Sequence, residues 1–187
     1  MIDLLSDYCK KIELDITDTQ LQQFDDYYRF LVEKNKVMNL TTIIEKEDVV
    51  LKHFIDSIYI MKYTDFDEKK VIDIGTGAGF PGIPLAIMNP QTSFVLLDSL
   101  NKRINFLNEV CNLCNLSNVI TIHGRAEEIS RKEEYREKFD YVVSRAVANL
   151  TVLSEYCLPY VKTGGTFISY KSGTVQEEAE EAEKAIN

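Results

Sequence analysis

The chain has 187 residues, of which 45% are hydrophobic, and carries a formal net charge of −9 at pH 7. This length is enough for one principal domain with a sizeable core and a small accessory part. The charge argues against indiscriminate nucleic-acid binding, which needs a basic surface, although it allows a local basic patch. No apolar run approaches the roughly 20 residues that span a bilayer, and no signal-peptide pattern is present, so we expect a soluble cytoplasmic protein.

Four cysteines are too few and too scattered for a disulfide framework. Cys111 and Cys114 form a C-x-x-C pair, which alone would suggest metal or redox chemistry. The pair lies in an apolar pattern of helical period, and no second cysteine pair or nearby histidine completes a zinc site. We therefore expect reduced core thiols and no bound metal.

The first 65 residues show helical patterns throughout. Thr17 and Gln20 form a capping box, which predicts the start of a helix with an apolar stripe at i, i+3 and i+4 spacing. A turn is expected at 35–42, and a further helix at about 46–61. We interpret residues 1–65 as an N-terminal helical cap on the main domain.

From residue 66 onward, apolar strands and helices alternate. Strands are predicted at 71–74, 93–98, 119–122, 139–144 and 166–170. Helices are predicted near 82–88, 101–115, 148–158 and 174–186. Such alternation indicates an α/β fold with a mostly parallel, Rossmann-like sheet and helices on both faces, here over residues 66–187.

Residues 71–82 join a β-branched strand to a glycine-rich turn and the start of a helix. Such a unit lets a nucleotide-like ligand approach bare backbone at the carboxyl end of a strand. A dinucleotide fingerprint needs its third glycine at position 80, but that position is Phe80 and the third glycine is Gly79. With Asp73 before Gly75, the pattern Asp-x-Gly-x-Gly-x-Gly resembles the first motif of class I methyltransferases, which bind S-adenosylmethionine.

This resemblance gives the loop residues roles. Gly75, Gly77 and Gly79 would allow close approach of the methionine part of the cofactor, and Asp73 would supply negative charge near its ammonium group. The alternative is a structural glycine turn in some other α/β protein.

Polar residues follow the later strands at the same expected edge of the sheet. Asp98 closes the second strand, where a carboxylate can accept hydrogen bonds from both ribose hydroxyls; a helix N-cap is the alternative. In class I methyltransferases the loop after the third strand embraces the adenine, which makes Ala126 and Glu127 candidates for that contact. A polar loop entering a short helix is the alternative for them.

The fourth strand ends in Ser144 and Arg145, where amino-methylating relatives carry an Asn/Asp-Pro-Pro-Tyr motif. The absence of that motif disfavours methylation of adenine N6 or of an amide. An arginine at the mouth of the site suits a phosphate or guanine O6 and N7, because its forked donors fit two acceptors. A structural salt bridge is the alternative for Arg145.

Longer motifs occur together and in order, at 39–41 (Asn-Leu-Thr), 52–57 (Lys-His-Phe-Ile-Asp-Ser), 73–87, 97–103, 125–128 (Arg-Ala-Glu-Glu) and 144–148 (Ser-Arg-Ala-Val-Ala). Over nearly the whole chain, this set resembles the bacterial ribosomal RNA small-subunit methyltransferase G family, also called glucose-inhibited division protein B. The resemblance implies methyl transfer from S-adenosylmethionine to N7 of a guanine in the decoding-region loop of 16S ribosomal RNA. The implied partner is this RNA or the small ribosomal subunit, and a monomer is expected.

The resemblance also assigns residues. It implies cofactor contacts at Gly75, Phe80, Ala126, Glu127 and Arg145, and RNA contacts at Arg125, Arg145 and Lys171, with the Lys102–Arg103 pair a weaker candidate. Guanine N7 carries a lone pair and no proton, so no general base is expected, and Arg145 and Lys171 would position the substrate. His53 need not be catalytic, and it could equally be a core histidine. Lys171 could equally be an ordinary surface lysine.

Family members generally continue past the position of Asn187 with a final strand pair, so this chain looks short at its C-terminus. The edge beside the fifth strand is then expected to be exposed unless it is covered. One alternative function is therefore a catalytically silent module that binds RNA or the cofactor. A small-molecule methyltransferase is another, and a nicotinamide-dependent reductase is the least favoured.

Overall fold

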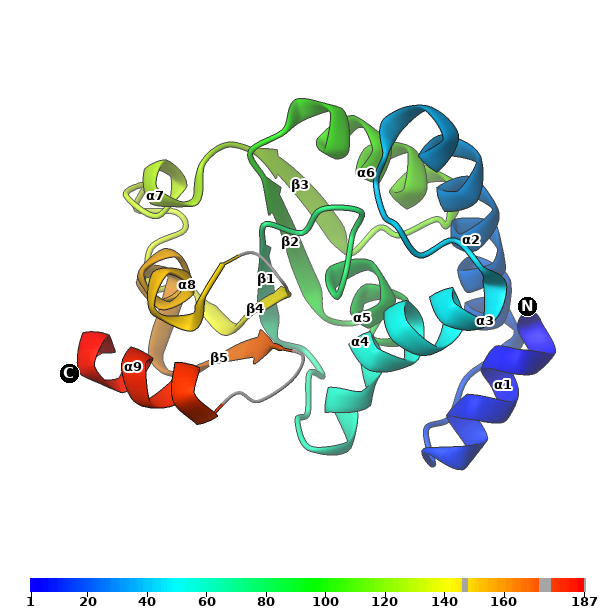
Figure 1. Cartoon of the computed structure of the whole chain (residues 1–187), viewed down its shortest axis with the longest axis horizontal. Coiled ribbons are helices and arrows are strands. Elements are labelled where there is room, and N and C mark those ends of the chain that lie inside the picture. Colours follow the sequence, from blue (N-terminus) through cyan, green and yellow to red (C-terminus); the bar gives the residue numbers. More distant parts are fainter. Residues whose placement is uncertain (146–147, 172–175, 187) are drawn as a thin grey trace.

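The computed structural model describes residues 1–145, 148–171 and 176–186 (Figure 1). Within these residues, five parallel strands form one sheet in the order β3-β2-β1-β4-β5. The strands are β1 (Lys70–Ile74), β2 (Ser93–Asp98), β3 (Val119–His123), β4 (Phe139–Arg145) and β5 (Val161–Tyr170). The strand order reverses between β1 and β4, which is where open α/β sheets form a crevice at the carboxyl ends of their strands.

The N-terminal part is helical. It comprises α1 (Ile2–Lys11), α2 (Asp18–Met38), α3 (Lys46–Val49), the π-helix η1 (Val50–Ile55), α4 (Asp56–Ile58) and the 3₁₀-helix η2 (Tyr59–Lys62). The predicted capping box starts α2, since the Thr17 hydroxyl accepts a hydrogen bond from the Gln20 amide and the Gln20 side chain accepts one from the Thr17 amide. Asn39, in the left-handed conformation, ends α2.

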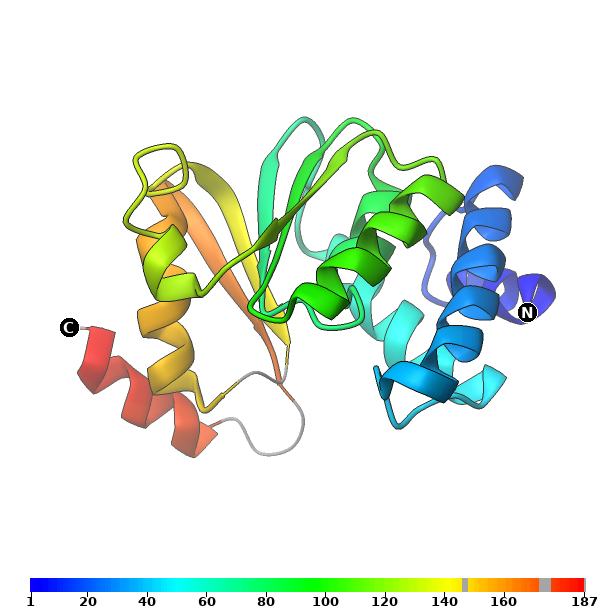
Figure 2. The same ribbon diagram turned by 90° about the horizontal axis from the view of Figure 1, so that it is seen from above.

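The remaining helices connect the strands. They are α5 (Gly82–Met88), α6 (Asn101–Leu113), α7 (Ala126–Ile129), α8 (Leu150–Cys157), the 3₁₀-helix η3 (Leu158–Tyr160) and α9 (Gln176–Ile186). Figure 2 shows helices on both faces of the sheet: α6 lies with the N-terminal helices on one side, and α7, α8 and α9 lie on the other. The predicted α/β architecture with a parallel sheet is confirmed.

One apolar core joins the N-terminal helices to the helices that follow β1 and β2. It includes Leu5, Phe24 and Phe54 from the N-terminal part, together with Ile83 of α5 and Leu107 of α6. A second core, between the sheet and α8, contains residues such as Ile72, Val142 and Leu153. Residues on both sides of the predicted boundary at 65 thus contribute to the same core, and the division into two domains stays a prediction.

Several elements differ from the sequence prediction in their bounds, most of them by one or two residues at an end. The helix predicted at 46–61 consists of α3, η1, α4 and η2 in succession, with π geometry in its middle. Strand β5 begins five residues early, and a register shift against β4 accommodates residues that include Gly164, whose φ is +78°. The C-terminal helix was predicted to begin at 174; residues 174 and 175, like residues 146 and 147 of the 144–148 motif, lie outside the described residues.

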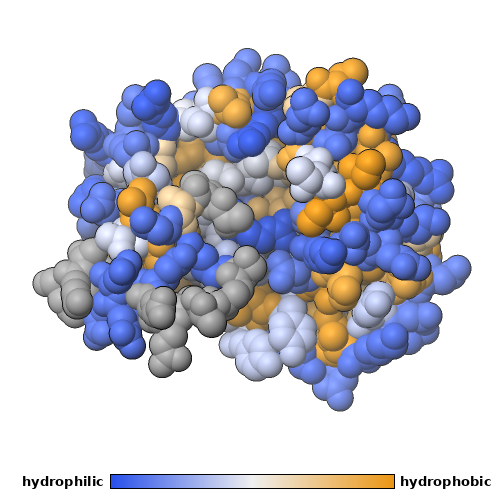
Figure 3. Space-filling model, in the orientation of Figure 1, coloured by the Kyte–Doolittle hydropathy of each residue, from blue (hydrophilic) through white to orange (hydrophobic). Residues whose placement is uncertain are grey.

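The surface seen in Figure 1 is largely hydrophilic, and the apolar residues on it gather mainly on the side of the N-terminal helices (Figure 3). No helix in the described ranges is both long enough and apolar enough to cross a membrane.

Candidate cofactor and substrate site

The turn after β1 is a loop in which three glycines have positive φ. Gly75, Gly77 and Gly79 have φ values of +68°, +64° and +101°, which residues with a Cβ atom rarely adopt. The amides of Gly75 and Thr76 both donate to the carbonyl oxygen of Leu97, at 2.9 and 3.1 Å. These bonds fix the loop against the carboxyl end of β2, so that its backbone forms the floor of the crevice.

Asp73 lies beneath this loop and is fully buried. Its Oδ2 atom accepts hydrogen bonds from the Thr76 hydroxyl at 2.7 Å and from the Gly82 amide at 2.9 Å. Burial raises the pKa of the Asp73 carboxyl to about 7. The carboxylate therefore ties the loop to the start of α5, and it is not among the described residues that line the pockets above the loop.

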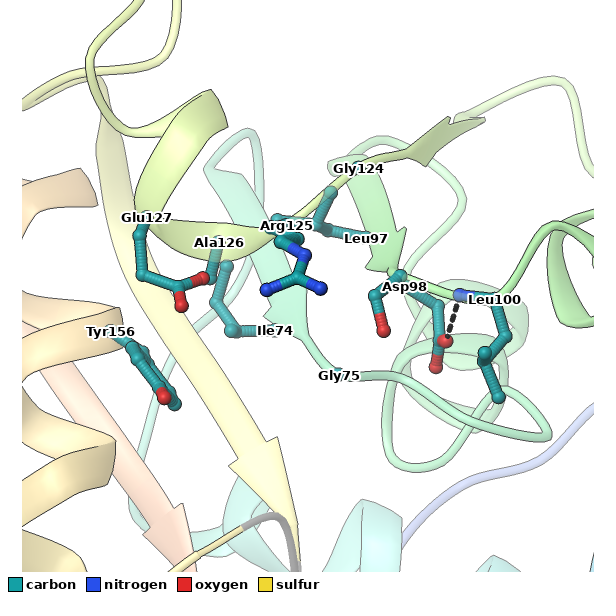
Figure 4. A pocket seen from close by; sticks show the side chains of 11 residues that line it. Ile74, Gly75, Leu97, Asp98, Leu100, Gly124, Arg125, Ala126, Glu127 and Tyr156 are labelled. Atoms are coloured by element: carbon teal, nitrogen blue, oxygen red, sulfur yellow. Dashed lines mark hydrogen bonds between the residues drawn. The ribbon is translucent and has the colours of Figure 1, made fainter.

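The first pocket has a volume of about 320 Å³ and lies at the carboxyl ends of β1, β2 and β3. We call it the Asp98–Glu127 pocket; its described lining residues are Ile74, Gly75, Leu97, Asp98, Ser99, Leu100, Gly124, Arg125, Ala126, Glu127 and Tyr156. In Figure 4 the Arg125 guanidinium lies between the carboxylates of Glu127 and Asp98, above the backbone of Gly75. The sequence-predicted residues for ribose and adenine are thus brought together here.

Asp98 is almost completely buried, and both of its carboxylate oxygens accept hydrogen bonds. Oδ1 accepts from the Leu100 amide at 2.9 Å, and Oδ2 accepts from the Gly77 amide at 2.9 Å and from Arg103 at 3.2 Å. Asp98 therefore holds the glycine loop and the start of α6 together. The bond from the Leu100 amide is a turn bond two residues along the chain and not an N-cap, because the N-cap residue of α6 is Leu100, which has no side-chain cap. Asp98 also lines both pockets.

The second pocket has a volume of about 430 Å³ and lies between the glycine loop and the N-terminal helices. We call it the His53–Arg145 pocket; its described lining residues are Leu40, Thr41, His53, Gly75, Thr76, Gly77, Ala78, Phe80, Asp98, Ser99, Arg103 and Arg145. The two pockets share Gly75, Asp98 and Ser99, so they lie side by side at the edge of the sheet, and we refer to them together as the trough.

Arg145 ends β4 and connects the sheet to the N-terminal helices. Its Nη1 atom donates to the Lys52 carbonyl oxygen at 3.2 Å and to Asp56 at 3.0 Å, and its guanidinium carbon lies 5.0 Å from the centre of the Phe80 ring. The structural ion pair considered for Arg145 is therefore present. The same side chain also lines the trough, so both interpretations of this residue have a geometric basis.

His53 is the central residue of the trough that sequence reasoning did not assign to the site. Its ring stacks on Phe80 with ring centres 4.3 Å apart, and its two nitrogens lie 3.3 Å from Arg145 Nη2 and 2.9 Å from the Thr41 hydroxyl. Burial, and then the charge of Arg145, lower the pKa of His53 to about 4, so the ring is neutral at pH 7. Both His53 and Thr41 belong to motifs that carry the family resemblance, and this membership is the signal in the sequence that could have indicated them as site residues.

Two other predicted residues lie away from the trough. Gly79 is enclosed, because a Cβ atom there would come within 3 Å of Ile83, Leu107 and Tyr27. Lys171, after β5, donates to the carbonyl oxygen of Ala148 at 2.6 Å and pairs with Glu178 of α9 at 2.8 Å. Lys171 thus ties the end of β5 to the segment before α8 and to α9, and its predicted role toward RNA stays a prediction.

The C-x-x-C pair lies in α6 and its C-cap, as expected. Burial raises the pKa of Cys111 to about 11 and that of Cys114 to about 12, so both are thiols at pH 7. In the described part of the chain, no group of three or more His, Cys, Asp or Glu side chains is placed to hold a metal ion.

The trough fits a ligand with two chemically different ends. Bare backbone at Gly75 and Gly77 allows close contact, and a Cβ atom at Gly77 would find its nearest neighbour, the Gly75 oxygen, only at 3.9 Å. On one side of these glycines lies a pocket with Asp98 and Glu127, suited to the hydroxyls and amine of an adenosyl group. On the other side lies a pocket with two arginines, Arg103 and Arg145, suited to a carboxylate.

Comparison with known proteins agrees with this chemistry. The family model described as "rRNA small subunit methyltransferase G" matches residues 20–187. The protein named "Ribosomal RNA small subunit methyltransferase G" from Desulforamulus reducens is 54% identical over 183 residues, which cover 97% of this chain and 76% of the relative. A protein of the same name from Lachnoclostridium phytofermentans is 56% identical over 178 residues, covering 95% of this chain and 74% of the relative.

Among solved structures, a precorrin-6y C5,15-methyltransferase from Geobacter metallireducens superposes with a TM-score of 0.56 at 15% identity, covering 80% of this chain and 73% of that one. At this identity the likeness concerns the fold alone. Fold, trough and comparisons together define a class I S-adenosylmethionine-dependent methyltransferase. The chain belongs to the rRNA small subunit methyltransferase G family.

One prediction separates the loop's conformational role from its role in binding. Replacing Gly77 by alanine is expected to lower the free energy of unfolding by about 1 kcal/mol, because alanine is strained at positive φ. It is also expected to weaken S-adenosylmethionine binding, because the added methyl group occupies space in the pocket that Gly77 lines. Gly164→Ala is the matched control: φ there is +78° and nothing lies within 4 Å of its Cβ position. Urea denaturation and calorimetric titration of both variants test this, and equal cofactor affinities would contradict it.

Proposed function

We propose that the chain transfers a methyl group from S-adenosylmethionine to N7 of a guanine in the decoding-region loop of 16S ribosomal RNA. The observation that carries the proposal is the family match over residues 20–187, combined with a trough whose two pockets meet at the glycine loop. We further propose that the protein acts in the cytoplasm as a monomer.

Alignment, and not proton transfer, is the task that this reaction sets the protein. Guanine N7 attacks with an in-plane lone pair and has no proton to lose, so the residues must place nucleophile, methyl carbon and sulfur in line. The bound cofactor supplies the electrophilic methyl group. His53, neutral and hydrogen-bonded through both ring nitrogens, fits a fixed wall better than a base.

Contacts with RNA require a local basic region on an acidic protein. Arg125 and Arg103 line the trough, and Lys102 follows Asn101 at the start of α6. Arg125 supports the proposal because it is exposed and lines the trough, where either the cofactor or a nearby phosphate can reach it. For Lys171 to contact RNA, it would have to exchange its bond with Glu178 for a phosphate.

In the experiment, the protein is incubated with labelled S-adenosylmethionine and, in parallel, with unmethylated 16S RNA or with unmethylated small subunits. Cleavage of the RNA chain at N7-methylguanosine then locates the label. We expect one cleavage site in the decoding-region loop, and the two arms determine whether free RNA or the assembled particle is the substrate. The relative from Desulforamulus reducens serves as the positive control.

Three outcomes would contradict this proposal. Cofactor binding without any transfer, while the control relative labels the RNA, would indicate a catalytically silent binding module. Label at a position other than guanine N7 would refute the assigned chemistry. Transfer to a small molecule with no binding of RNA at low salt would favour a small-molecule methyltransferase.

A further inference from the structure

Thr41 occupies a rigidly held position in the wall of the His53–Arg145 pocket. It follows the left-handed Asn39 that ends α2, and the side chain of Asn35 fixes its backbone from both sides. Asn35 Oδ1 accepts hydrogen bonds from the amides of Leu40 at 2.6 Å and Thr41 at 2.9 Å, and Asn35 Nδ2 donates to the Thr41 carbonyl oxygen at 2.9 Å. The hydroxyl of Thr41 is therefore presented to the pocket by a preorganised turn.

The hydrogen bonds around His53 determine which atom carries each proton. Arg145 Nη2 lies 3.3 Å from His53 Nδ1, and an arginine can only donate, so Nδ1 is the acceptor. A neutral ring with Nδ1 accepting carries its proton on Nε2. Nε2 lies 2.9 Å from the Thr41 hydroxyl oxygen, to which it must then donate.

The Thr41 oxygen receives a second hydrogen bond from the Ile43 amide, at 3.1 Å. A hydroxyl has two acceptor lone pairs and one proton, and these two bonds use both lone pairs. The proton of Thr41 is thus directed to a further acceptor, and Thr41 itself lines the pocket. Arg145, His53 and Thr41 together form a relay of hydrogen bonds, which leaves the Thr41 hydroxyl to act as a hydrogen-bond donor in one direction.

The π-helix η1 places His53 within reach of both Arg145 and Thr41. His53 lies within Val50–Ile55, where π geometry alters the direction of its side chain compared with an uninterrupted α-helix. The ring reaches Phe80, Arg145 and Thr41 at the same time, from three different parts of the chain. Single-turn π segments are often found at functional sites, which agrees with this arrangement.

The residues around the His53–Arg145 pocket indicate the acceptor. Its described lining contains two arginines and one aspartate, which favours an anion. Gly75 and Gly77 also line it, and the Asp98–Glu127 pocket, suited to the adenosyl group, lies beside it. We infer that the Thr41 hydroxyl donates to the carboxylate of the methionine part of S-adenosylmethionine, and thereby positions the cofactor. This inference rests on the cofactor site assigned above, but it does not depend on the RNA substrate.

The test compares two ligands and two substitutions by calorimetric titration. S-adenosylhomocysteine carries the carboxylate, and 5′-methylthioadenosine lacks the whole amino-acid part. Thr41→Val, nearly isosteric but without the hydroxyl, is expected to weaken S-adenosylhomocysteine binding about tenfold or more, in line with loss of a hydrogen bond to a charged group. The affinity for 5′-methylthioadenosine is expected to stay unchanged, and Thr41→Ser should retain the affinity for both ligands.

Two results would overturn the inference. If Thr41→Val weakens both ligands equally, the residue has only a structural role. If it leaves S-adenosylhomocysteine affinity unchanged, the carboxylate is held elsewhere; a lower kcat/KM for RNA in that variant would assign the hydroxyl to the target guanine instead. Should Thr41→Val fail to fold, Thr41→Ala allows the same comparison. Absence of RNA methylation by the unmodified protein would refute the proposed function without changing these binding results.

Discussion

Replacing Arg145 by glutamine is expected to lower the affinity for S-adenosylmethionine about 100-fold, which corresponds to about 2.7 kcal/mol. The guanidinium is the positive charge at the end of β4, it lies over Phe80, and it fixes the His53 ring through Nη2. Glutamine removes the charge and shortens the side chain, so the pocket loses both a cation and the orientation of its histidine. Calorimetric titration with S-adenosylmethionine measures the effect.

The control for this prediction is Asp56→Asn. Asp56 pairs with Arg145 at 3.0 Å, but its side chain is 53% exposed, so the ion pair should contribute less than about 1 kcal/mol. The substitution removes the charge partner and leaves the pocket wall intact. An Arg145→Gln variant that binds the cofactor within threefold of the unmodified protein would contradict a cofactor role for Arg145, and would leave the residue with its contacts to the N-terminal helices.

Replacing Gly82 by alanine is expected to destabilise the protein by about 2–3 kcal/mol, the upper part of the range found for overpacked cores. A Cβ atom there would lie 2.3 Å from Leu96 Cδ2, 2.8 Å from Asp73 Oδ2 and 3.2 Å from Asp73 Cβ. The buried Asp73 side chain has little room to move, because it is bonded to Thr76 and to the Gly82 amide itself. Urea denaturation monitored by circular dichroism gives the free energy of unfolding.

The matched control is Gly124→Ala. The Cβ atom at Gly124 would meet only two atoms of the Ile129 side chain, at 2.8 and 2.9 Å, and the outer atoms of an isoleucine can rotate away more easily than a bonded carboxylate. Its expected loss of stability is therefore smaller than that of Gly82→Ala. If the two substitutions destabilise the protein equally, tight packing between Asp73 and α5 is not what determines the cost at Gly82.

The sheet was predictable because its signals are local. Apolar runs ending at Ile74 and Asp98 gave the first two strands, and alternating glycines gave the turn between β1 and α5. The extra length of β5 was not predictable, since it depends on a register shift against β4. Glycine at 164 is compatible with a turn before a strand as well as with an irregular strand, and only pairing decides between these structures.

The trough was predictable only in part, because some of its wall, formed by Leu40, Thr41 and His53, comes from the N-terminal part of the chain. Loop position placed Asp98, Ala126 and Glu127 correctly at the edge of the sheet. His53 and Thr41 reach the trough through contacts between residues far apart in sequence, and through a π segment that no apolar periodicity distinguishes from an α-helix. Asp73 follows a family motif, but its hydrogen bonds turn the carboxylate toward the protein interior.

Tyr27 of α2 supports the glycine loop from behind, with its ring 5.4 Å from that of Phe80 and its hydroxyl donating to the carbonyl oxygen of Ala78 at 2.5 Å. The chain contains ten tyrosines and no tryptophan, so no indole emission masks the phenol signal. We expect a ligand seated on the loop to change the environment of the phenol that is buried beneath it. Intrinsic tyrosine fluorescence is then expected to report ligand binding without a label, and Tyr27→Phe tests the contribution of this one ring.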